Sequence, residues 1–109
     1  MLFDPKWNPI EIKIEPWQKV LLDAANLLES AGWCQNMMGD SFGRHCAIGA
    51  IHAVKCDDLH SMANAACALS KHIQTGFSRS KYIDIPDWND YRGRTKEQVI
   101  ATMRKVAKT

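Results

Sequence analysis

The sequence lacks the features that mark membrane and secreted proteins. No stretch approaches the ~18 uninterrupted apolar residues that a membrane-spanning helix requires. The first thirteen residues carry Asp4, Glu11 and two prolines, and they have no apolar core of the signal-peptide type. We therefore expect a cytoplasmic protein that does not associate with membranes.

The sequence also lacks any C-x-x-C pair, so the usual spacing of zinc ribbons and fingers is absent. Its cysteines are Cys34, Cys46, Cys56 and Cys67, and in a cytoplasmic protein we expect them to be reduced. We expect no cofactor. If a metal were bound, the candidate ligands would be Cys34, Cys46, Cys56 and His60.

There is no large excess of charge of one sign: 14 Lys and Arg oppose 12 Asp and Glu, for a formal net charge of +2. This balance argues against a dedicated nucleic-acid-binding protein. Basic residues do gather near the C-terminus, at Arg92, Arg94, Lys96, Arg104, Lys105 and Lys108. They allow weak attraction to nucleic acid, although a solvated helix face explains them as well.

Hydrophobic residues make up 46% of the 109 residues, which is typical of one globular domain. Apolar spacing of three and four predicts a mainly α fold with helices over 16–31, 46–55, 58–74 and from Thr95 onward. Residues 1–15 are interpreted as an arm before a helical domain, 16–109. Alternating residues at 10–14 and 81–85 predict a small two-stranded element.

Residues 33–53 are the most informative stretch, because a turn-rich loop at 36–45 is followed by small and apolar residues. Gly49 lies among alanines in the second predicted helix, where glycine costs up to ~1 kcal/mol relative to alanine. We therefore predict that another backbone lies close to Gly49.

Cys46 is the candidate catalytic residue, since it begins that helix and the positive end of a helix favours a thiolate. The adjacent His45 is a candidate partner. The alternative is that Cys46 is a small buried side chain, as free cysteines usually are. The sequence leaves both open.

The segment Ile85–Asp90 combines carboxylate, amide and indole groups. Trp88, Asn89 and Asp90, with Arg92 and Arg94, are candidate ligand-binding residues. Asp and Asn in such turns also bond their own backbone, and tryptophan often fills the edge of a core. Both interpretations remain.

Several short motifs follow one another in a distinctive order: Trp33-Cys34-Gln35, Cys46-Ala47-Ile48-Gly49-Ala50-Ile51, Trp88-Asn89-Asp90, and a Thr95-capped helix with Glu97, Val99 and Ile100. This order resembles an uncharacterised family of short proteins from actinobacteria, rhizobia and their phages, over about residues 17–107. The resemblance implies no established activity, cofactor or catalytic residue. The phage members imply that a host-directed binding role is conceivable.

The favoured function is a non-enzymatic module that binds a protein partner or associates with itself. No convincing catalytic set is present, and five methionines and four tryptophans exceed what a small core needs. The alternatives are a cysteine-dependent enzyme using Cys46 and a weak nucleic-acid binder using the basic C-terminal region.

Overall fold

The structure is a computed structural model that describes residues 14–56, 58–75 and 84–109. These residues form α1 (Pro16–Ala31), α2 (Ala47–Ala53), α3 (Leu59–Thr75), α4 (Ile85–Asn89) and α5 (Lys96–Ala107). Extended pairing within the same ranges is limited to two single bridges, which His45 makes with Trp33 and Gly39. The protein is therefore mainly helical, as the sequence predicts.

The predicted number of four helices is wrong, because α4 forms a short additional helix where the sequence suggests irregular chain. The Asp84 carboxylate caps it by accepting the Asp87 amide at 2.8 Å, and Pro86 lies in the first turn, where no amide is needed. Ile85, predicted as the last residue of a strand, is the first residue of α4. The rest of that strand, 81–83, and the arm with its strand, 1–13, lie outside the described residues.

The predicted ends of two helices are confirmed. The helix α1 spans the predicted range and stops at Gly32, whose φ of 106° suits glycine and whose amide donates to the Leu28 carbonyl. At the start of α5, Thr95 and Gln98 exchange hydrogen bonds of 3.1 Å in a capping box.

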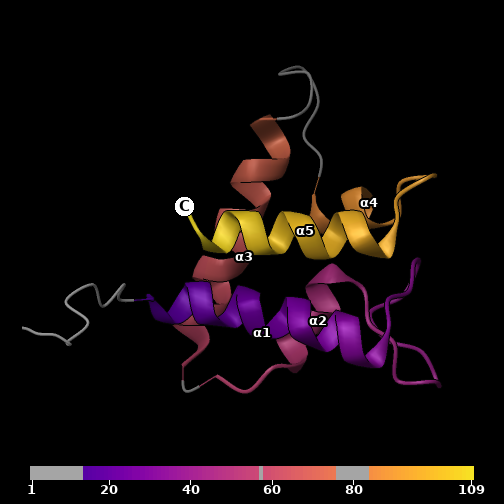
Figure 1. Cartoon of the computed structure of the whole chain (residues 1–109), viewed down its shortest axis with the longest axis horizontal. Coiled ribbons are helices and arrows are strands. Elements are labelled where there is room, and N and C mark those ends of the chain that lie inside the picture. The colour runs from indigo at the N-terminus through magenta and orange to yellow at the C-terminus, as the bar shows by residue number, and fades with distance from the viewer. Residues whose placement is uncertain (1–13, 57, 76–83) are drawn as a thin grey trace, which may run out of the picture.

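Two antiparallel helices, α1 and α5, lie side by side, and α3 crosses them at a steep angle (Figure 1). Their facing sides form the core together with α2, and the largest side chains without exposed surface include Leu21, Leu28, Ile51, Leu69, Val99 and Met103. The Gln18 side chain donates to the Ala107 carbonyl at 2.8 Å, which fastens the end of α5 to the start of α1. In the described part of the chain, no helix is both long and apolar enough to cross a membrane.

Candidate functional site in the loop between α1 and α2

The loop that joins α1 to α2, residues 32–46, closes on itself through backbone hydrogen bonds. The Cys34 amide donates to the His45 carbonyl at 3.0 Å, and the His45 amide donates to the Gly32 carbonyl at 3.1 Å. Further along, the Cys46 amide donates to the Met38 carbonyl at 3.1 Å. This α1–α2 loop is therefore a defined structure rather than an open connection.

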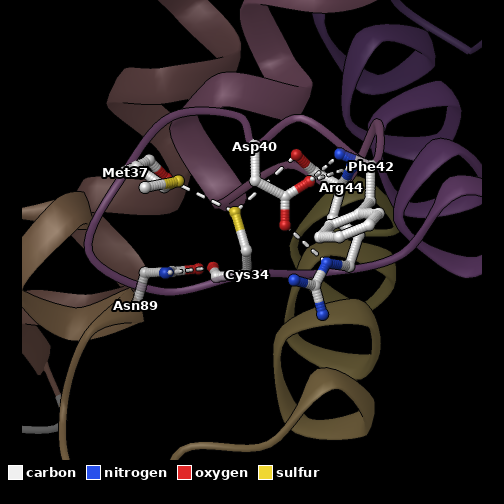
Figure 2. Close-up of polar contacts among 6 residues, drawn as sticks. All are labelled: Cys34, Met37, Asp40, Phe42, Arg44 and Asn89. Carbon is white, nitrogen blue, oxygen red and sulfur yellow. Dashed lines mark hydrogen bonds and ion pairs between the residues drawn. The ribbon is translucent and has the colours of Figure 1, made fainter.

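Asp40 organises the tip of the α1–α2 loop. Its carboxylate accepts the amides of Phe42 and Arg44, each at 3.0 Å, and it pairs with the Arg44 guanidinium (Figure 2). Desolvation alone would raise the pKa of Asp40, but the hydrogen bonds from Arg44 and Phe42 hold that pKa below its usual value. The ionised carboxylate is thus part of the folded loop.

Asn89 joins the α1–α2 loop to α4 and α2. Its side chain is entirely buried, and its Oδ1 accepts the Trp33 indole N–H at 2.7 Å and the Ala47 amide at 2.9 Å. Its Nδ2 donates to the Cys34 carbonyl at 3.1 Å and to the Asp90 carboxylate at 3.0 Å. Both acceptor positions and both donor hydrogens of the amide are therefore used.

Two neighbouring side chains extend this connection. The Asp90 carboxylate accepts the Asn36 amide at 2.8 Å, and the Gln35 amide group donates to the carbonyls of Asn89 and Tyr91 at 3.1 and 3.2 Å. Members of three of the motifs that carry the family resemblance, Trp33-Cys34-Gln35, Cys46-Ala47 and Trp88-Asn89-Asp90, thus meet around one buried asparagine.

Gly49 provides the close backbone approach that the sequence predicts, and the prediction is confirmed. A Cβ atom built on Gly49 would overlap the carbonyl oxygen of Met38 and lie 2.9 Å from its carbon. The α1–α2 loop therefore rests directly on α2, and any side chain at position 49 would push the loop away.

Cys34 and Cys46 are both buried, at 8% and 4% exposure. Cys46 caps α2, since its sulfur accepts the Gly49 amide at 3.3 Å. The Cys34 thiol donates weakly to the carbonyls of Met37 and Arg44, 3.6 and 3.7 Å away, and Figure 2 shows its sulfur directed into the loop. Burial, followed by Asp40, raises the pKa of the Cys34 thiol.

The candidate ligand-binding residues differ in burial. Trp88 and Asn89 are buried in the protein interior. Arg94 stacks 4.7 Å from the Trp88 ring and donates to the Trp88 carbonyl at 3.0 Å, and burial lowers the pKa of Arg94. Asp90 is half-buried and Arg92 is exposed. Any binding role for these residues stays a prediction.

The candidate catalytic and metal-binding residues are spread over several elements. His45 is half-buried beside Gly39 in the α1–α2 loop, whereas Cys56 and the exposed His60 lie near the start of α3. Across residues 14–56, 58–75 and 84–109, no three His, Cys, Asp or Glu side chains are grouped so that they could hold a metal ion. Catalysis by Cys46 stays a prediction.

Sequence reasoning missed the exposed apolar side chains of the α1–α2 loop. Met37 and Met38 are 52% and 53% exposed, and Phe42 is 81% exposed. Tyr91, 59% exposed, lies on the neighbouring turn that Gln35 contacts, and both segments occupy the same end of the molecule (Figure 1). A methionine pair inside a turn-rich segment, with no helical period to bury it, was the available signal.

A groove adjoins this apolar surface. A hollow of about 160 Å³ beside Met37 and Met38 shares Ile48 and Pro86 with a larger open groove of about 520 Å³. The larger groove lies between α2, α3 and α4 and is lined mainly by apolar surface, including Ala66 and Ile85. Met37 and Met38 therefore lie at one end of an apolar depression.

Residues 14–109 match the protein family described as "Family of unknown function (DUF6197)". No curated protein and no solved structure matches the chain. The match confirms the resemblance to an uncharacterised family, while the origin of its members and its motifs stay predictions. The match covers nearly the whole chain and begins where α1 is about to start, and the chain therefore belongs to the DUF6197 family.

Proposed function

We propose that this protein is a docking module that binds another protein through the exposed apolar side chains of the α1–α2 loop. The docking face consists of Met37, Met38, Phe42 and Tyr91. The observation that carries the proposal is the exposure of these four side chains, three of them in the α1–α2 loop and one on the turn that Gln35 contacts. Exposed methionines and aromatics are typical of contact surfaces.

The bracing of the loop supports the same proposal. A loop fixed before binding loses little conformational entropy when a partner arrives, so its contacts contribute more fully to affinity. Here the Asn89 hydrogen bonds, the Asp40 turn and the backbone contact at Gly49 all fix the segment that carries the docking face. The adjoining groove offers room for an apolar side chain of the partner.

The alternatives have less support. Cys46 is 4% exposed, and its sulfur is engaged by the Gly49 amide. Of the basic residues, Arg104 pairs with Glu29 at 2.9 Å, and Arg94 stacks on Trp88. An enzyme using Cys46, a nucleic-acid binder, a host-directed role and a cytoplasmic location therefore stay predictions.

Site-specific photocrosslinking in the cells that naturally produce the chain tests the proposal. A benzophenone amino acid replaces Phe42 in one variant and, as a matched control, the exposed Lys105 of α5 in another. We expect a discrete crosslinked product from position 42 and none from position 105. Adding Met38→Ser to the first variant should remove the product.

The mass of the product separates partner binding from self-association, because a second copy adds the mass of this chain. Equal crosslinking from both positions, or no product from position 42 at natural expression levels, would contradict a docking role for this face.

A further inference from the structure

Cys34 and Cys46 lie opposite one another in the α1–α2 loop. Trp33 and His45 form a parallel bridge, and each cysteine is the next residue along its segment, so the two side chains lie on the same side of the pair. Neighbouring extended segments are about 4.8 Å apart, within the range of about 4.4–6.8 Å between Cα atoms that a disulfide requires. Both are free thiols in this structure.

We propose that Cys34 and Cys46 form a reversible disulfide when the protein meets a hydroperoxide, and that this bond regulates the docking face. The bond would close a ring around residues 35–45, which carry Met37, Met38 and Phe42. The regulatory part rests on the proposed function, whereas formation of the bond does not.

Both cysteines are buried, and the first reaction is assigned to Cys46 because it adjoins a hollow although only 4% of its surface is exposed. Cys46 lines the hollow of about 160 Å³ beside Met37 and Met38. This volume is several times the roughly 30 Å³ that one water molecule occupies, so a molecule of hydrogen peroxide fits. Cys34 does not line this hollow, and burial together with Asp40 and Cys46 raises the pKa of its thiol. Cys34 is thus the second cysteine to react.

The chemistry balances with the peroxide as oxidant. The Cys46 sulfur gives up its proton and attacks one peroxide oxygen, so an S–O bond forms, the O–O bond breaks and the departing hydroxide takes up that proton as water. The Cys34 sulfur then attacks the Cys46 sulfenic sulfur, so the S–S bond forms and the second hydroxide leaves with the Cys34 proton. Two thiols lose two electrons, and hydrogen peroxide becomes two waters.

The bond would change the loop because the Cys34 thiol hydrogen is lost. That hydrogen is directed at the carbonyls of Met37 and Arg44. The Arg44 carbonyl keeps the Asp40 amide as a donor, but the Met37 carbonyl loses this contact. Oxidation therefore acts on the backbone of a residue that belongs to the docking face.

The test uses the full chain with Cys56→Ser and Cys67→Ser, which removes the half-buried and the exposed cysteine and leaves only this pair. After brief treatment with hydrogen peroxide, the protein is unfolded and labelled with N-ethylmaleimide, and its mass is measured by mass spectrometry. We expect the label to fall from two groups to none, with the loss of two hydrogens, and dithiothreitol should restore both. Adding Cys34→Ser should prevent the bridge and leave Cys46 to gain oxygen.

Full labelling after peroxide, or oxygen uptake by both sulfurs without a bridge, would overturn the disulfide. If the variants do not fold, non-reducing peptide mapping of the wild-type chain also shows whether the Cys34–Cys46 disulfide forms. Crosslinking through position 42 should fall about fivefold on oxidation, the low end of typical coupling between sites. Equal crosslinking of both forms would overturn the regulation, whereas a bridge with no crosslinking in either form would count against the proposed function alone.

Discussion

The helical frame and the α1–α2 loop are held by different kinds of interaction. The frame of α1, α3 and α5 is built from apolar side chains, such as Leu28 and Leu69, that leave water. The loop is built from directed hydrogen bonds to Asn89 and from a backbone contact at Gly49. Removing apolar atoms from the frame lowers the free energy of unfolding in proportion to the volume removed. Removing one amide from the loop instead leaves several buried polar groups without partners.

The largest expected effect comes from removing that amide. The Asn89→Ala substitution leaves the Trp33 indole, the Ala47 amide and the Cys34 carbonyl without their partner. Each unsatisfied buried group costs about 1–3 kcal/mol, so we expect the free energy of unfolding to fall by about 3 kcal/mol or more in urea denaturation.

Asn26→Ala is the matched control, because Asn26 is exposed and its side chain accepts a surface hydrogen bond from Arg104. It should change the free energy of unfolding by less than about 0.5 kcal/mol. If both asparagine variants were equally stable, the buried amide would not be what holds the loop.

Gly49→Ala separates local propensity from the tertiary contact. In an isolated helix the change would stabilise by up to about 1 kcal/mol. Here the new methyl group meets the Met38 carbonyl, so we expect a loss of about 1–3 kcal/mol instead. A raised melting temperature would show that the loop does not rest on α2 at this point.

Acid should weaken the loop through Asp40. Its pKa is lower in the folded protein than in the unfolded chain, where it is about 3.9. Its stabilising contribution is therefore complete above the unfolded pKa and is lost as the pH falls through the folded pKa. The stability difference between wild type and Asp40→Asn, measured by denaturation from pH 2 to 6, should be largest at the upper end and shrink toward pH 2. A difference independent of pH would contradict this role of the charge.

The smallest effect on stability is expected at the docking face. Met38 is about half exposed, so Met38→Ser should change the free energy of unfolding by less than about 0.5 kcal/mol. Circular dichroism melting checks this expectation, and a large loss would mean that the side chain serves the fold rather than a partner.

The frame could be predicted from the sequence because its signals are local. Apolar spacing, Pro16 and Gly32 define α1, and Thr95 with Gln98 defines the start of α5. A close backbone contact could be predicted at Gly49, because glycine inside a helix is less stable than alanine and needs a compensating contact. The sequence does not indicate that Met38 makes this contact. The helix α4 was missed because five residues hold too little periodicity, even with Asp84 and Pro86 as signals.

The site could be predicted only in part, since its bonds join residues far apart in the chain. Nothing in the neighbourhood of Asn89 indicates that Trp33, 56 positions away, donates to it. The exposure of Met37, Met38 and Phe42 also depends on how the loop folds back on α2, which composition does not encode. Sequence reasoning singled out Trp88 for binding, whereas the structure buries it.

Amide hydrogen exchange of Asn89→Ala, compared with the wild type, tests the central claim. The claim is that the Asn89 side-chain amide holds the α1–α2 loop in place, whereas the apolar core holds α1, α3 and α5. Protection should fall at the amides of Cys34, Asn36 and Ala47, and the amides in the middle of α1 and α5 should remain slow. Uniform loss of protection throughout the chain, or an unchanged loop, would contradict the account.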